Sequence, residues 1–158
     1  MTGSVVAVRP AGADDAPALA EGNVRLARES EGRALDAARV ERGVRRILAD
    51  PARGAYWVAE ADGAVRGQCL VTTEWSDWSD GRYWWFQSVW VDPDWRGRGV
   101  FRALWDRVLE AARVAGDVAS IRLYVEAENA SARAVYERLG MGLTGYRMYE
   151  LPLPREAG

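Results

Sequence analysis

Residues 96–99, with the sequence Arg-Gly-Arg-Gly, are the part of this chain best suited to chemistry. They lie between a strand-like apolar run over 83–91 and a helix-like run over 100–115. Glycines leave the N–H groups of a turn unshielded by Cβ atoms, and the N-terminus of a helix carries partial positive charge. Two arginines add full positive charges at the same place. We therefore predict that this glycine-arginine turn binds the phosphate or pyrophosphate of a cofactor.

Two common phosphate-binding motifs do not fit this turn. A P-loop needs Gly-Lys-Ser/Thr before its helix, and the chain contains no lysine. A dinucleotide-binding fingerprint needs a third glycine where this chain has Arg102. The alternative left open is an ordinary strand-to-helix turn whose two arginines are solvated.

A second set of spaced residues follows a strand-like run over 121–126. Asn129, Ala132, Tyr136 and Gly140-Met141 stand in the order N-x-x-A-x-x-x-Y-x-x-x-G-M. Asn129 is also well placed to cap a helix. Tyr136 shares an apolar helical stripe, so it is suited to a core role as well as to a site.

In order and spacing, the two segments resemble the GNAT superfamily of N-acetyltransferases, most strongly over 83–141. The resemblance implies one domain over residues 1–158, with an α/β fold (a mixed sheet flanked by helices) in the order β-α-α-β-β-β-α-β-α-β. It implies acetyl-CoA as co-substrate, with the pantetheine arm filling a gap between two splayed strands. The implied cofactor contacts are Val89, Trp90, Val91, Arg96, Gly97, Arg98, Gly99, Val100, Phe101, Arg102 and Asn129.

Phe101 departs from the family, which usually has glycine or alanine at this position. Its ring either crowds the diphosphate or points inward beside Trp105. Its main-chain N–H group is unaffected in both cases.

The chemistry implied is acyl transfer from a thioester to an amine. N–H groups near Val89–Val91 are suited to stabilise the oxyanion, and Tyr136 is suited to protonate the leaving thiolate. For the base we favour Glu74, whose partial burial would raise its pKa, ahead of Asp77 and Glu29. The alternative for each carboxylate is a solvated surface position.

Aromatic and acidic residues occur together in the segment 74–82, which reads as a loop. Trp75 and Trp78, beside Asp77, favour an ammonium group through cation–π contact and charge pairing, whereas Trp84 and Trp85 are expected in the core. The predicted substrate contacts are Trp75, Asp77 and Glu29, the last expected on another loop. We therefore predict a small cationic amine as the acceptor. The alternatives are a non-catalytic acyl-CoA-binding module, an enzyme acting on a protein amine, and a hydroxyl acceptor.

Composition restricts the class of protein further. A chain of 158 residues fits one domain, and a net charge of −2 argues against a nucleic-acid partner. A single cysteine, Cys69, in an apolar run fits the core of a cytoplasmic protein. Without histidine we expect no metal, and no run approaches the roughly 20 apolar residues of a membrane span. Relatives are often dimers, so a homodimer is possible.

The expected elements follow from apolar periodicity and turn residues. Asp62-Gly63 is a strong hairpin signal between two strands. The expected strands are 5–8, 56–60, 64–73, 83–91, 121–126 and 143–151, and the expected helices are 16–28, 35–48, 100–115 and one after Asn129.

Overall fold

The computed structural model describes residues 5–155, so both ends of the expected 158-residue domain lie outside it. The chain forms two compact units, Met1–Tyr124 and Val125–Gly158, which are described separately. The elements of the first unit are β1 (Ala7–Pro10), α1 (Ala16–Glu31), α2 (Ala37–Ala49), β2 (Ala55–Ala61), β3 (Ala64–Ser76), β4 (Gly81–Val91), α3 (Val100–Ala115) and β5 (Val118–Arg122).

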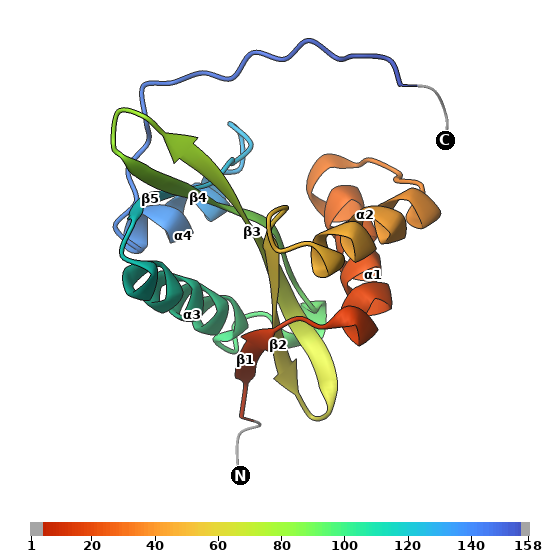
Figure 1. Cartoon of the computed structure of the whole chain (residues 1–158). Coiled ribbons are helices and arrows are strands. Elements are labelled where there is room, and N and C mark those ends of the chain that lie inside the picture. The colour runs from red at the N-terminus through yellow and green to blue at the C-terminus, as the bar shows by residue number, and fades with distance from the viewer. Residues whose placement is uncertain (1–4, 156–158) are drawn as a thin grey trace. The chain divides into compact units, whose positions relative to one another are not determined.

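The first unit is built on one mixed sheet. Its strands lie in the order β1-β2-β3-β4-β5, with antiparallel neighbours except for the parallel pair β4–β5. Helices α1 and α2 cover one face of the sheet and α3 covers the other (Figure 1). The expected fold class, a mixed sheet flanked by helices, is confirmed.

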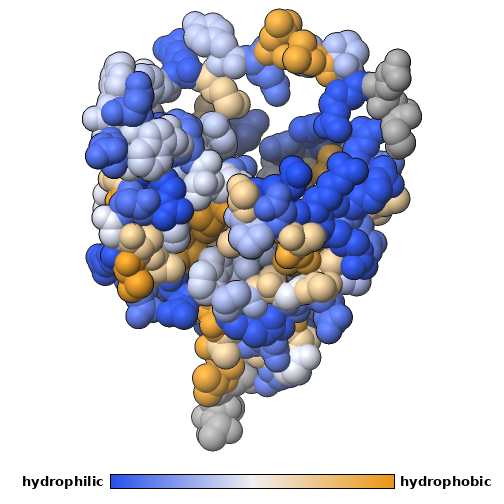
Figure 2. All heavy atoms as spheres, in the orientation of Figure 1, coloured by the Kyte–Doolittle hydropathy of each residue, from blue (hydrophilic) through white to orange (hydrophobic). Residues whose placement is uncertain are grey.

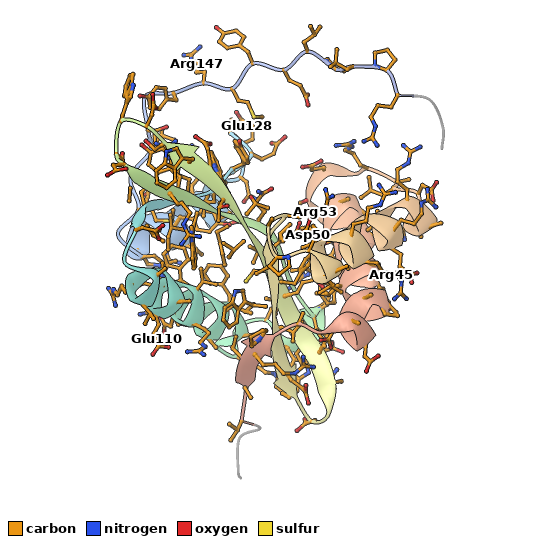
Figure 3. The ribbon with its side chains drawn as sticks, in the orientation of Figure 1. Arg45, Asp50, Arg53, Glu110, Glu128 and Arg147 are labelled. Atoms are coloured by element: carbon orange, nitrogen blue, oxygen red, sulfur yellow. The ribbon has the colours of Figure 1, made fainter. Side chains whose placement is uncertain are left out.

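The core beneath α1 and α2 forms where apolar helix positions meet alternate strand residues. Leu19 of α1 and Val44 of α2 are buried against Tyr56, Val58 and Leu70 of the sheet. The opposite side of α2 carries exposed arginines, and the outer surface of these two helices is largely hydrophilic (Figure 2). After α2 an ion pair between Arg53 and Asp50, 3.1 Å long, spans the turn into β2 (Figure 3).

The other face of the sheet packs against α3. Phe86 of β4 meets Trp105 edge to face, with ring centroids 5.4 Å apart. Helix α3 has the bounds expected from the sequence, because left-handed glycines, Gly99 (φ 81°) and Gly116 (φ 77°), flank it. The first residue of α3 is therefore fixed relative to the face of the sheet that this helix covers.

The two hairpins differ in how well the sequence predicts them. At the β2–β3 turn, Asp62 and Gly63 both have positive φ, as a two-residue type I′ turn requires. The β3–β4 hairpin is longer than expected, since Glu74 pairs with Tyr83 and Trp75 with Arg82. The expected loop over 74–82 is therefore wrong except for the turn 77–80.

Several other expected bounds are wrong for identifiable reasons. Helix α1 continues to a left-handed Gly32, so Glu29 lies in its last turn and not on a loop. Strand β5 ends at Arg122, because its pairing with β4 stops there. Strand β1 is shifted to Ala7–Pro10, in register with β2.

The second unit contains helix α4 (Ala130–Arg138). The strand expected over 143–151 is wrong, because this segment forms no strand pairing among the described residues. Its apolar side chains, including Leu143 and Leu151, are largely exposed. Apolar alternation stabilises a strand only where a partner strand accepts its main-chain bonds and a buried face accepts its side chains.

Candidate active site

The glycine-arginine turn has the backbone shape that an anion site needs. Gly97 (φ 74°) and Gly99 (φ 81°) are both left-handed, and open space lies where a Cβ atom of either would stand. Helix α3 follows at once and has no side-chain cap at its N-terminus. Its first N–H groups therefore lack intrahelical acceptors and suit a phosphate.

The three predicted arginines have separate partners. Arg96 donates to the carbonyl of Val91 (3.1 Å) and pairs with Glu29. The guanidinium of Arg98 lies over the ring of Trp95, 5.2 Å from its centroid. Arg102 is exposed and pairs with Asp106 one turn along α3. Arg96 and Arg98 thus have partners next to the turn, whereas Arg102 pairs along the helix.

A gap in the strand pairing opens beside this turn. Strands β4 and β5 pair from Arg82↔Val118 to Trp85↔Arg122 and no further. Beyond that point the β5-side edge of β4, over 86–91, has no partner strand in the first unit. Unpaired main-chain groups are costly when buried. An extended amide chain is the kind of ligand that satisfies them. The pantetheine arm expected between the two strands is such a chain.

A β-bulge lies in β4 at this gap and was not foreseen from the sequence. Leu70 pairs with Gln87 and Gln68 with Trp90, so Ser88 and Val89 together stand opposite Cys69. Ser88 has a φ of 50°, which a residue with a Cβ rarely adopts. Serine carries no turn signal inside an apolar strand, so the pattern gave no indication of the bulge.

Strand alternation separates the carboxylates and tryptophans that the sequence groups into one pocket. Leu70 packs toward α1 and α2, so Glu74, four residues on, shares that face. There Glu74 accepts a hydrogen bond from the indole of Trp85 (3.0 Å). Trp75 takes the opposite face, that of α3. Glu74 is exposed, so the partial burial expected of it is not found.

The remaining acceptor candidates lie at the surface. Trp75 is 61% exposed and Trp78, in the hairpin turn, is 90% exposed. Asp77 accepts from the N–H of Trp78 (3.1 Å). Trp84 and Trp85, expected in the core, are half-buried. Trp85, which stacks on Tyr124 with ring centroids 4.5 Å apart, is the indole that bonds to Glu74, a predicted catalytic carboxylate.

Asn129 and Tyr136 belong to the second unit. Asn129 caps α4 by accepting from the N–H of Ala132 (3.1 Å), so the capping role is confirmed. Tyr136 is half-buried on α4, and desolvation raises the pKa of its phenol above the ordinary value of 10.0. The phenol therefore keeps its proton at neutral pH, as a general acid must.

Other kinds of site find no support in the described residues. Cys69 is fully buried, and burial raises the pKa of its thiol, which is therefore not a nucleophile. Among residues 5–155 no three histidine, cysteine, aspartate or glutamate side chains gather as a metal site would need. In the same range no helix combines the length and apolar character needed to cross a membrane.

Comparisons with known proteins agree with this geometry. The model of the acetyltransferase (GNAT) family matches residues 23–141. A mycothiol acetyltransferase of Beutenbergia cavernae is 40% identical over 84 residues, 53% of this chain but only 27% of that protein. The chain thus spans about a quarter of that curated relative's length.

Solved structures resemble the chain over most of its length. A possible acetyltransferase from Clostridium difficile 630 is 37% identical with a TM-score of 0.89, covering 96% of this chain and 99% of that one. A predicted acetyltransferase from Clostridium acetobutylicum, solved with acetyl-CoA, shares the fold at 19% identity and a TM-score of 0.77, with coverages of 93% of this chain and 96% of that one.

Proposed function

Because this chain belongs to the acetyltransferase (GNAT) family, we propose that it transfers the acetyl group of acetyl-CoA to the primary amine of a small, cationic molecule. Membership confirms the resemblance inferred from the motifs, and it supports acetyl transfer as the activity. The observation that carries the proposal is the unpaired edge of β4 beyond Trp85↔Arg122, which leads along the chain toward the open glycine-arginine turn.

The first unit offers a separate feature for each part of acetyl-CoA. The turn and the uncapped start of α3 suit the diphosphate, since left-handed Gly97 and Gly99 leave N–H groups unshielded. The unpaired edge of β4 suits the amides of the pantetheine arm. We assign Val89, Trp90 and Val91 to that arm and Arg96 and Arg98 to the phosphates.

The reaction forms an N–C bond and breaks the C–S bond of the thioester. Main-chain N–H groups at the bulge of β4 stabilise the negative charge that develops on the carbonyl oxygen. Glu74, directly or through water, accepts the proton lost by the amine, and Tyr136 gives its proton to the thiolate. The raised pKa of Tyr136 supports this assignment, because the phenol stays protonated at the working pH.

The acceptor reaches the face of the sheet that α1 covers. That face carries the carboxylate of Glu74 with the indole of Trp85 bonded to it, an arrangement that suits an ammonium group. Glu29 adds negative charge at the end of α1. The name of the mycothiol acetyltransferase relative supports a small molecule over a protein as acceptor.

A calorimetric titration with acetyl-CoA, with adenosine diphosphate as control ligand, tests the cofactor half of the proposal. Much tighter binding of acetyl-CoA than of the diphosphate is expected, because both the turn and the edge of β4 then contribute. A screen of small amines for release of CoA thiol tests the transfer. A folded protein that binds acetyl-CoA but acetylates no amine, with Tyr136→Phe unchanged in every assay, contradicts catalysis and favours a binding module.

A further inference from the structure

A partly buried chain of polar contacts links helix α1 to the bulge of β4. Gln68, fully buried on β3, donates its amide to Asn23 of α1 (2.9 Å) and to the carbonyl of Leu19 (3.2 Å). Asn23 in turn donates to the hydroxyl of Tyr56 (3.0 Å). The phenol of Tyr56, only 4% exposed, also interacts with the Ser88 side chain, and this interaction opposes the rise in its pKa that burial causes. The chain of bonds ends at the one strand residue of β4 that has positive φ.

The bulge explains why Tyr56 reaches Ser88. Tyr56, Leu70 and Gln87 are partners across β2, β3 and β4, so their side chains share the face covered by α1. The next residue along a regular strand would point to the opposite face. Because two residues of β4 stand opposite Cys69, Ser88 can bond to Tyr56 on the α1 face as well.

The left-handed conformation of Ser88 needs such support. A residue with a Cβ atom is sterically disfavoured there, and persists only where its surroundings fix it. The interaction with Tyr56 holds the Ser88 side chain, Asn23 bonds to the Tyr56 hydroxyl, and Gln68 in turn fixes Asn23. Gly22 of α1 permits this packing, since a Cβ at that position would stand 2.2 Å from Oε1 of Gln68.

We propose that Tyr56 is a positioning residue, which fixes Ser88 in its left-handed conformation and thereby aims the N–H groups of the β4 bulge at the acetyl carbonyl. The bulge lies just past Trp85↔Arg122, the last β4–β5 pair, so its main chain borders the gap assigned to acetyl-CoA. The inference rests on the proposed function for the identity of that ligand. The inference goes beyond the proposed function because it names the side chain that sets the geometry of the N–H donors.

Four variants separate positioning from other roles of Tyr56. Tyr56→Phe and Ser88→Ala each remove the bond but keep the steric cost of the conformation. Ser88→Gly removes that cost, because glycine adopts positive φ freely. We expect Tyr56→Phe and Ser88→Ala to lose activity alike, and Tyr56→Phe/Ser88→Gly to regain it. Asp62→Gly, at the positive-φ position of the β2–β3 turn, is the control and leaves activity unchanged.

Two spectroscopic readouts do not depend on turnover. The Cα and Cβ chemical shifts of Ser88 report its backbone conformation in the ligand-free protein, and Tyr56→Phe is expected to move them away from left-handed values. The infrared carbonyl band of bound acetyl-CoA, labelled with ¹³C at the thioester carbon, reports its polarisation by hydrogen bonds. Binding to the wild type is expected to lower the frequency of this carbonyl band relative to free acetyl-CoA. Tyr56→Phe should lose most of this shift, and the double variant should restore it.

In turnover we expect about a ten-fold loss of kcat for Tyr56→Phe, less than the roughly 10²–10³ that follows deletion of a whole donor. The Kd for acetyl-CoA should stay within about two-fold, since the diphosphate and pantetheine contacts remain. Hydroxylamine serves as the amine, because so small a nucleophile needs no acceptor pocket. Far-ultraviolet circular dichroism confirms that each variant is folded.

The outcomes distinguish this inference from the proposed function. Unchanged Ser88 shifts and an unchanged carbonyl band in Tyr56→Phe, with acetyl-CoA bound by wild type, overturn the positioning role alone. Loss of activity that Ser88→Gly does not rescue overturns it too, because Tyr56 then acts on the reactants directly. Failure of wild type to bind acetyl-CoA overturns the proposed function, and with it the catalytic meaning of the bulge.

Discussion

Arg96, in the turn before α3, forms an ion pair with Glu29 in the last turn of α1, 67 positions earlier in the chain. The same guanidinium is assigned to the diphosphate of acetyl-CoA. A carboxylate and a diphosphate compete for one cation, so on this assignment we expect Glu29 to oppose the binding of the cofactor. Binding of the diphosphate to Arg96 in turn leaves the Glu29 carboxylate available to a cationic acceptor.

Replacing Glu29 by glutamine is therefore expected to strengthen acetyl-CoA binding. Both side chains are about half exposed, and an exposed ion pair is worth about 0–1 kcal/mol, so the Kd should fall by no more than about five-fold. Calorimetry measures this change, and Arg96→Ala should weaken binding. Glu41→Gln, which breaks the Arg45–Glu41 pair on α2, is the matched control (Figure 3 labels Arg45). A higher Kd for acetyl-CoA in Glu29→Gln would contradict the competition between Glu29 and the diphosphate for Arg96.

Glu74 and Trp75, although adjacent, are expected to respond differently to mutation. Glu74→Gln removes the proposed proton acceptor and should lower kcat for the amine by about 10²-fold, with the Kd for acetyl-CoA unchanged. The sequence alone predicts that Trp75→Ala weakens acceptor binding. Because Trp75 lies on the α3 face, we instead expect the KM of the Trp75→Ala variant for the amine to change by less than about two-fold. A large rise in that KM would place the acceptor on the α3 face.

The parts of the fold that the sequence predicts well are set by local chemistry. The bounds of α3 follow from Gly99 and Gly116, and the β2–β3 turn follows from Asp62-Gly63. The parts it predicts poorly depend on partners far away in the chain. Strand β5 stops at Arg122 because its pairing with β4 ends there, and residues 143–151 lack the partner strand that their alternation presumes.

The same distinction holds at the candidate site. The glycine-arginine turn was recognisable because glycine and arginine have few other reasons to alternate before a helix. The sequence does not predict the bulge at Ser88 or its links to Tyr56 and Gln68. These features arise from register and side-chain packing among three elements. Glu74 and Trp75 are separated for a simpler reason: both lie in a strand, where adjacent side chains point to opposite faces, and not in the expected loop.

Tyr136 is expected to give the activity a characteristic dependence on pH. Desolvation raises its pKa above 10.0, so the phenol stays protonated, and able to donate, up to at least pH 10. The rate should rise as the amine loses its proton and fall only above pH 10, where the phenol ionises. Initial rates of thiol release across this range measure the profile.

Tyr136→Phe should lower kcat by about 10²–10⁴ and abolish the alkaline fall, with the Kd for acetyl-CoA unchanged. Tyr149→Phe, which removes a hydroxyl from a side chain that is 94% exposed, should match wild type. An alkaline fall that persists in Tyr136→Phe would mean that another group supplies the proton.

Phe101 stands where the family usually has glycine or alanine, and its ring points inward. It meets Phe86 edge to face with centroids 6.2 Å apart, on the α3 side of the sheet. Such a contact and its half-buried area are worth about 1–2 kcal/mol, less than the roughly 3–5 kcal/mol for a fully buried phenylalanine. Phe101→Ala should therefore lower the free energy of unfolding by this amount, measured by urea denaturation. Because its main-chain N–H is retained, the Kd for acetyl-CoA should stay within about two-fold, and a marked gain in affinity would show that the ring crowds the diphosphate.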